Sequence, residues 1–253
     1  MGEPAPVTLD EEDHPVSGGV PGYAYAFQPI VDVHRRRIYS YEALIRGPQG
    51  EPAWSVLGRV APEAASAFDH QTRVAAITAA GRLGIDCHLN VNCLPSSLED
   101  PAAALAATLT AARRARLPLS RLIIEVTENE MIADRERFAH TIGEFRRAGV
   151  KIAIDDFGAG YSGLNLLAEF QPDLIKLDMA LVRGIESHGP RQAIVRAIVS
   201  ACEDLGMEII AEGVETLDEL SWCEDAGVSL FQGYLLGRPG FDCLPEAELP
   251  ARR

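Results

Sequence analysis

Short apolar runs alternate with longer amphipathic stretches along most of the chain. Runs that are typical of buried strands lie at 87–92, 122–126, 151–155, 173–178, 207–212 and 228–233. Stretches that are typical of helices follow the first five, at 101–116, 134–148, 162–170, 191–205 and 216–226. Such a regular alternation of strand and helix favours parallel pairing of the strands.

The chain before residue 87 has a different pattern. Two alternating runs, at 23–33 and 36–46, are joined by the short basic turn from His34 to Arg37, which predicts an antiparallel hairpin. A helical region is expected over 54–83. About eight strands in about 230 residues favour an α/β fold, a (β/α)8 barrel of the TIM type with one antiparallel strand near the N-terminus. A doubly wound open sheet is the alternative.

Composition adds limits on domains and partners. The chain has 253 residues, of which 47% are hydrophobic, enough for one large domain. We expect a flexible acidic leader at 1–22, a barrel domain at 23–245 and a tail at 246–253. A net charge of −14 argues against DNA or an anionic membrane surface as the main partner. A phosphorylated substrate stays possible, because metal ions can invert the local field.

The cysteines and the apolar runs bear on location. The five cysteines contain no C-x-x-C pair, which favours reduced thiols over a disulfide framework or a zinc ribbon. No run of 18 apolar residues and no signal-peptide pattern occurs. We therefore expect a cytoplasmic protein without membrane insertion.

Polar side chains terminate nearly every predicted strand: Glu42, Asn92, Glu125, Asp155, Asp156, Lys176, Asp178, Glu212 and Gln232. In β/α barrels the carboxyl ends of the strands form one ring, so these groups should converge. So many acids together are costly unless they bind cations. All candidate ligands are oxygens, which favours Mg²⁺ or Mn²⁺ over Ca²⁺, and zinc least. They exceed the needs of one ion and suit two ions about 3.5–4 Å apart, as used for in-line attack on phosphorus.

The stretch 151–163, KIAIDDFGAGYSG, carries two adjacent carboxylates at a strand end. Asp155 or Asp156 is the natural bridge between two ions, and Lys176 could orient water or balance phosphate charge. Simpler interpretations stay open: a surface Asp-Asp turn, a turn amide at Asn92, a cap at Glu212, or a Lys176–Asp178 salt bridge.

Taken together, the motifs resemble the EAL domain, the cyclic di-GMP phosphodiesterase family. They are QPIVD at 28–32, EAL at 42–44, VN at 91–92, EVTE at 125–128, DDFGAGYSGL at 155–164, KLD at 176–178, AEGVE at 211–215 and QGYLLGRP at 232–239. The resemblance covers about residues 23–240. The segment after Arg46 is similar to a shorter branch of the family, whose members can be coupled to photosensory domains.

The resemblance implies a role for each matching residue. One metal ion would be held by Glu42, Asn92, Glu125 and Asp155, and the second by Asp155, Asp156 and Glu212. Lys176 and Gln232 would lie beside the hydrolytic water. Together with Glu212 and Glu42 they form the expected catalytic group. Gln28 and Arg46 would hold the guanine and phosphate parts of the substrate. Glu128 would fix the loop that begins at Asp155, and Asp178 and Glu215 would support the ligands from behind.

The resemblance also implies cofactors and partners. Two Mg²⁺ or Mn²⁺ ions per site are expected, with Ca²⁺ inhibitory, and a homodimer through helices beside the 155–164 loop. A regulatory partner protein is possible. The predicted activity is hydrolysis of cyclic di-3′,5′-GMP to linear 5′-pGpG. The alternatives are a cyclic di-GMP receptor or interaction module with little turnover, and a metal-dependent barrel lyase.

Overall fold

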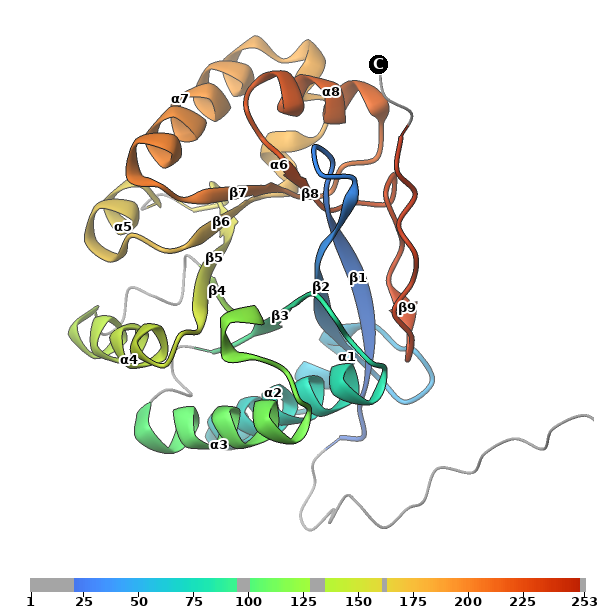
Figure 1. Cartoon of the computed structure of the whole chain (residues 1–253), viewed down its shortest axis with the longest axis vertical. Helices are drawn as coiled ribbons and strands as arrows, with labels where there is room; N and C mark the ends of the chain where they lie inside the picture. Colours follow the sequence, from blue (N-terminus) through green and yellow to red (C-terminus); the bar gives the residue numbers. More distant parts are fainter. Residues whose placement is uncertain (1–20, 95–100, 128–134, 161–162, 251–253) are drawn as a thin grey trace, which may run out of the picture.

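The computed structural model describes residues 21–94, 101–127, 135–160 and 163–250 (Figure 1). The predicted leader before residue 21 and Glu128 therefore lie outside the described residues. In the described part, no helix is long and apolar enough to cross a bilayer. All five cysteines are described, and no disulfide joins them.

Eight strands close into a barrel. These strands are β1 (Ala24–Asp32), β2 (Arg37–Arg46), β3 (His88–Asn92), β4 (Leu122–Thr127), β5 (Lys151–Phe157), β6 (Leu174–Leu177), β7 (Glu208–Ala211) and β8 (Leu230–Phe231). A further strand, β9 (Gly240–Phe241), pairs with β1. The order β2-β3-β4-β5-β6-β7-β8-β1 is closed by pairing of β1 with β2. β1 is antiparallel to β2 and β8, and β2 to β8 run parallel. The predicted barrel with one antiparallel strand is confirmed, and the open sheet is excluded by this closure.

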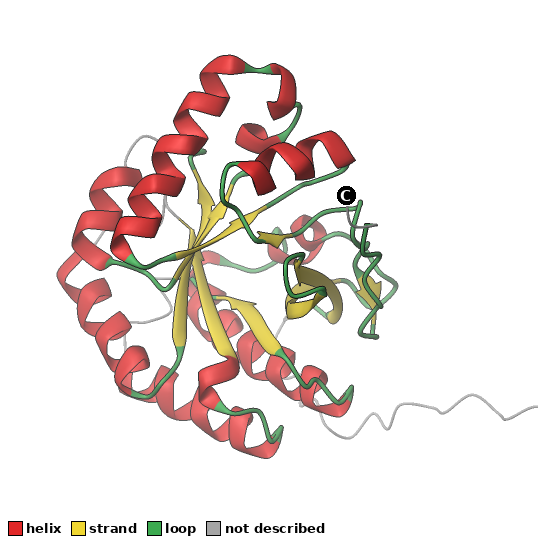
Figure 2. Cartoon of the chain, turned by 45° about the horizontal axis from the view of Figure 1, so that its top comes forward, coloured by secondary structure: helices red, strands yellow, loops and turns green. Residues whose placement is uncertain are grey.

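Helices surround most of the barrel, as Figure 2 shows for the red ring around the yellow strands. They are α1 (Ala53–Leu57), α2 (Ala65–Arg82), α3 (Pro101–Arg114), α4 (Arg135–Arg147), α5 (Gly163–Phe170), α6 (Met179–Val182), α7 (Gly189–Leu205) and α8 (Leu217–Asp225). Single 3₁₀ turns lie at Pro62–Ala64, Leu119–Arg121 and Ile185–Ser187. Beside β1 the strand β9 takes the outer position instead of a helix (Figure 1).

Three features differ from the expected elements. The helical region over 54–83 is two helices, because Gly58 ends α1 and Pro62 then begins a 3₁₀ turn. The expected strand at 228–233 pairs only at Leu230 and Phe231, where it meets the antiparallel β1. The short α6 and β9 were not expected, because neither segment has an apolar period that predicts a helix or a strand.

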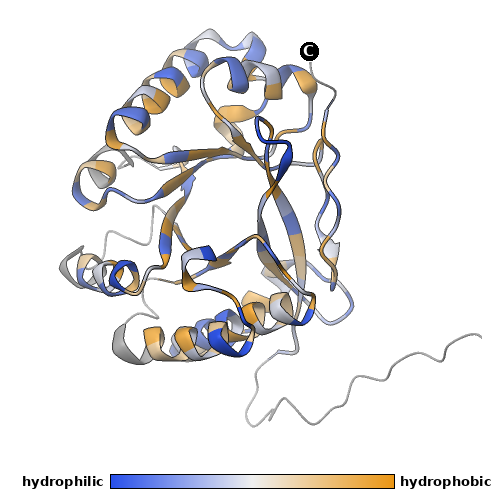
Figure 3. Cartoon of the chain, in the orientation of Figure 1, coloured by the Kyte–Doolittle hydropathy of each residue, from blue (hydrophilic) through white to orange (hydrophobic). Residues whose placement is uncertain are grey.

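The apolar core has two layers. An inner cluster inside the barrel contains Ile30, Tyr39, Ile123, Ala153, Leu174, Ile210 and Leu230. A larger cluster includes buried residues of the strands and of the surrounding helices, among them Ile124, Ile152 and Phe145. Hydrophobic and hydrophilic positions accordingly alternate along the outer helices in Figure 3. Burial of both faces of the sheet explains the near-continuous apolar runs in the strand sequences.

Gly233, directly after Gln232, lies where the chain leaves the barrel against the loop that follows β7. A Cβ atom at Gly233 would lie 2.0 Å from the Val214 carbonyl oxygen, which belongs to backbone and cannot rotate away. Gly189 makes a useful comparison, because a Cβ atom there would meet nothing within 4 Å.

We predict that Gly233→Ala lowers the free energy of unfolding by about 1–3 kcal/mol, because the added methyl group must displace backbone. Gly189→Ala should leave it unchanged or raise it slightly. Urea unfolding followed by circular dichroism measures both. Equal stability of the two variants would contradict the close approach at Gly233.

Candidate metal and active site

The inward face of the barrel changes from apolar to polar towards the carboxyl ends of the parallel strands. Because side chains alternate along a strand, the residue two positions after an inner-core residue also faces inward. In five strands an apolar residue of the inner cluster is followed two positions later by a polar residue of the site. These pairs are Ile123 and Glu125, Ala153 and Asp155, Leu174 and Lys176, Ile210 and Glu212, and Leu230 and Gln232. On the antiparallel β1 the order is reversed, so Gln28 precedes Ile30 and still reaches the same end.

The Lys176 side chain lies at the centre of this ring and is only 1% exposed. Its Nζ atom contacts four carboxylates: Glu212 at 2.8 Å, Glu125 at 3.0 Å, Asp155 at 3.0 Å and Glu42 at 3.4 Å. The alternative Lys176–Asp178 pair is not what the geometry shows, because Asp178 instead accepts a hydrogen bond from the Ala180 amide and caps α6. One buried ammonium group therefore faces four acids.

Amide side chains orient the carboxylates. Gln232 Nε2 donates to Glu42 Oε2 at 2.7 Å and to Gln28 Oε1 at 3.2 Å. Asn92 Nδ2 donates to the other Glu42 oxygen at 3.2 Å, so Glu42 is held from two sides. These hydrogen bonds place the predicted Gln28, Glu42, Asn92 and Gln232 in one connected network.

A buried amide that the sequence analysis missed, Asn90, donates through Nδ2 to Glu125 Oε1 at 2.7 Å. The available signal was its position, because Asn90 precedes Asn92 by two residues and so shares its face of β3.

A bulge lets two adjacent aspartates share the site. The β5–β6 register shifts between Ile154 and Phe157, and Asp156 has a φ of 54°. In a regular strand Asp155 and Asp156 would point to opposite faces. The left-handed backbone at Asp156 instead brings carboxylate oxygens of Asp155, Asp156 and Glu212 within 4.8 Å of one another. The pair therefore does more than open a surface turn.

The donor set fits hard divalent cations. Oxygens of Glu42, Glu125 and Asp155 also lie within 4.8 Å of one another, so the two groups share Asp155. Among the described residues, Glu125 Oε2 is a buried oxygen without a hydrogen-bond partner. Leaving such an atom unpaired is costly, and a cation would satisfy it. Two ions sharing Asp155 fit this arrangement.

Burial and mutual repulsion shift the pKa values of the acids in this ring. Burial raises the pKa of Glu212 to about 8, against the opposing effect of Lys176. Burial also raises the pKa of Glu125 well above its usual range. For Glu42, burial acts in the same direction, but Lys176 and the two amides outweigh it and lower the pKa. Burial opposes the charge on Lys176, yet the surrounding carboxylates raise its pKa well above normal.

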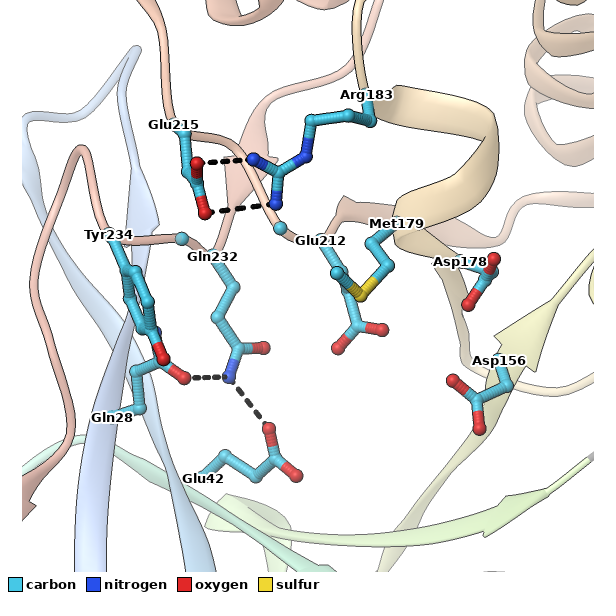
Figure 4. Close-up of a pocket in the computed structure, with 12 residues that line it drawn as sticks. Gln28, Glu42, Asp156, Asp178, Met179, Arg183, Glu212, Glu215, Gln232 and Tyr234 are labelled. Atoms are coloured by element: carbon cyan, nitrogen blue, oxygen red, sulfur yellow. Dashed lines mark hydrogen bonds and ion pairs between the residues drawn. The ribbon is translucent and has the colours of Figure 1, made fainter.

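A pocket opens above this cluster (Figure 4). It is lined by Gln28, Glu42, Asp156, Asp178, Met179, Arg183, Glu212, Gly213, Glu215, Gln232, Gly233 and Tyr234. The side chains of Glu42, Asp156 and Glu212 point into it from three sides in Figure 4. Seven of the lining residues were predicted, whereas Met179, Arg183 and Tyr234 were missed.

Two predicted residues lie elsewhere than expected, and a third is not described. Arg46 ends β2, donates to the carbonyl oxygen of Ile45 and is not one of the residues lining the pocket. Glu215 lines the pocket mouth, where it pairs with Arg183. Glu128 lies outside the described residues.

Comparisons with known proteins settle the family. The protein-family model that describes the EAL domain matches residues 22–239 of this chain. The chain belongs to the EAL domain family. It is 35% identical over 230 residues to the blue light- and temperature-regulated antirepressor BluF of Escherichia coli, covering 90% of this chain and 57% of BluF. It is 28% identical to the cyclic di-GMP phosphodiesterase PA2567 of Pseudomonas aeruginosa, covering 89% and 39%.

A solved structure extends the likeness. The manganese and cyclic di-GMP complex of BlrP1 from Klebsiella pneumoniae has 40% identity and a TM-score of 0.87, covering 96% of this chain and 60% of BlrP1. This EAL domain therefore spans little more than half the length of BluF and BlrP1 and less of PA2567.

We predict that metal-free protein loses stability as the pH rises from about 5 to about 8. The folded pKa of Glu212 is raised from 4.5 to about 8, so in this window the folded state keeps a proton that the unfolded chain releases. Glu212 alone should contribute a loss on the order of 1.4 kcal/mol per pH unit. Glu42 acts only at lower pH, because its folded pKa is below 4.5.

Thermal unfolding at a series of pH values, with chelator, measures this slope. Glu212→Gln should reduce it without removing it, since Glu125 acts in the same direction. Saturating Mn²⁺ should flatten it, because the ion replaces the proton. An unchanged slope in Glu212→Gln would contradict the assignment.

Proposed function

We propose that this EAL domain hydrolyses cyclic di-3′,5′-GMP to linear 5′-pGpG with two divalent cations. The observation that carries the proposal is the pair of carboxylate groups that share Asp155 at the base of an open pocket. Two cations that share a ligand are the usual arrangement for in-line attack on phosphorus. PA2567 is named as a phosphodiesterase for this nucleotide, and BlrP1 was solved with it and manganese.

The residues divide into metal ligands and groups that act on the water and substrate. One ion would be held by Glu42, Asn92, Glu125 and Asp155, and the other by Asp155, Asp156 and Glu212. Mg²⁺ or Mn²⁺ suits these oxygens, and Ca²⁺, with its looser geometry, should inhibit. Bound divalent ions lower the pKa of water and offset charge on phosphate oxygens.

The chain's own groups complete the reaction. Lys176 holds the carboxylates in one ring and orients the attacking water. Glu212, whose Oε1 lies 2.8 Å from Lys176 Nζ, is the carboxylate best placed to accept the proton from that water. Gln232 fixes Glu42 and Gln28 at the same side of the pocket. Gln28 and Arg46 would hold guanine and phosphate.

A receptor function is the second candidate. BluF, which shares 35% identity with this chain, is named as an antirepressor. In that case this chain would bind cyclic di-GMP and act on a partner protein without forming product. The oxygen ligands Glu42, Glu125 and Asp155 favour the enzyme, because a receptor needs no such set.

We predict that the purified protein forms linear pGpG from cyclic di-GMP with Mg²⁺ or Mn²⁺, and that chelator stops it. Glu42→Ala and Asp155→Asn should each lower the rate at least about 100-fold, because each removes a charged metal ligand. Asp204→Asn, at an exposed position on α7, is the matched control and should keep full activity. Chromatography of the products gives the rates.

Binding of the nucleotide without product would move the assignment to the receptor. Retained turnover in either ligand variant would contradict the two-metal site.

A homodimer through helices beside the 155–164 loop is part of the same proposal. One chain has a mass of 27.3 kDa, and light scattering after size exclusion should give twice that mass. A mass of one chain at all concentrations would contradict it.

A further inference from the structure

The lining of the pocket includes a single lysine or arginine side chain. Among the residues that line the pocket, five are acidic and Arg183 alone is lysine or arginine. Its guanidinium extends from the end of α6 across the top of the pocket to Glu215 (Figure 4). Nη2 donates to Glu215 Oε1 at 2.9 Å, and Nη1 pairs with Oε2, so the contact is bidentate.

The Arg183–Glu215 pair is fixed from below. Glu219 is buried at 2% exposure and accepts the Gly184 amide through Oε1 at 2.8 Å. Its other oxygen accepts the amides of Glu215 at 2.9 Å and Thr216 at 3.1 Å. One carboxylate thus joins the backbone beside Arg183 to the backbone of Glu215. The two side chains are held at the mouth rather than meeting there by chance.

The pair itself stays available to a ligand. The side chains of Arg183 and Glu215 are 40% and 41% exposed. An exposed ion pair contributes little stability, so its exchange for a ligand contact costs little. Arg183 can therefore turn its planar fork of donors to another acceptor pair in the pocket.

An aromatic platform lies at the same mouth. Tyr234 lines the pocket and is 50% exposed, and the Arg238 guanidinium carbon lies 4.2 Å from the centre of its ring. Figure 4 places Tyr234 on the same side of the pocket as Glu215. A half-exposed tyrosine ring backed by an arginine suits stacking with a flat base. The carboxylates at the pocket floor would suit the phosphate end instead when they hold cations.

We infer that Arg183 is a specificity-determining residue, which selects guanine by donating to O6 and N7 of a base bound at the mouth. The inference rests on the proposed function for its substrate. Arginine matches this acceptor pair bidentately, whereas adenine presents an amino donor in place of O6. A contact of Arg183 with phosphate would not distinguish the two bases. Arg183 thus separates guanine from adenine while the floor binds what both nucleotides share.

The test compares binding of cyclic di-GMP and cyclic di-AMP to the whole protein in Ca²⁺, which should support binding without turnover, by calorimetry and by competition. Arg183→Gln should weaken cyclic di-GMP about tenfold and cyclic di-AMP less than about twofold. Arg183→Lys should lose the same preference, because an ammonium group keeps the charge without the fork. Arg196→Gln, an exposed position on α7 against Trp222, is the charge-matched control and should change neither affinity.

Equal losses for both nucleotides would overturn the inference in favour of a phosphate contact. No loss for either, or full rescue of the preference by lysine, would also overturn it. Turnover of cyclic di-GMP by the unsubstituted protein is measured separately, with Mg²⁺ or Mn²⁺. Guanine preference that depends on Arg183 without turnover would remove the proposed enzyme and keep the inference. Turnover together with a guanine preference that survives Arg183→Gln would overturn the inference and keep the proposed enzyme.

Discussion

The contact of the Lys176 ammonium with four carboxylates is the constraint on which the site depends. Glu42, Glu125, Asp155 and Glu212 surround one positive charge inside the barrel, where water is too scarce to screen them. A single lysine cannot balance four acids, so protons or cations must supply the remainder. Burial raises the pKa of Glu212 and Glu125, whereas Lys176 and the two amides lower the pKa of Glu42, so the acids share the one positive charge unequally.

The fold places the acids together by simple geometry. Parallel strands bring their carboxyl ends to one edge, and the two-residue period puts a polar group above most of the apolar inner residues. Two departures from regularity complete the ring. The antiparallel β1 brings Gln28 to the same end from its N-terminal half, and the bulge in β5 turns Asp156 towards Asp155. The inner apolar cluster lies below the ring and helps to bury it. Because the ring is buried, the electrostatic interactions between its charges are stronger than they would be in water.

The sequence predicted the parts of the site that repeat, and missed those that depend on contacts between distant loops. The polar residue after each apolar run located Glu125, Asp155, Lys176 and Glu212, because strand period and barrel topology act on every strand alike. Glu215 was predicted, but its contact with Arg183, 32 residues away, was not, because only the packing of two loops on Glu219 joins them. Asn90 faces the ring from a position that the strand-end rule passes over. The length of β8 depends on how β1 closes the barrel, which no local pattern records.

The central claim is that two cations share Asp155 in this ring. The most direct measurement is anomalous diffraction at the manganese edge, from crystals grown with Mn²⁺ and the linear dinucleotide pGpG. The account predicts two peaks about 3.5–4 Å apart. One should lie among Glu42, Glu125 and Asp155, and the other among Asp155, Asp156 and Glu212. A single peak, or peaks away from Asp155, would contradict the account.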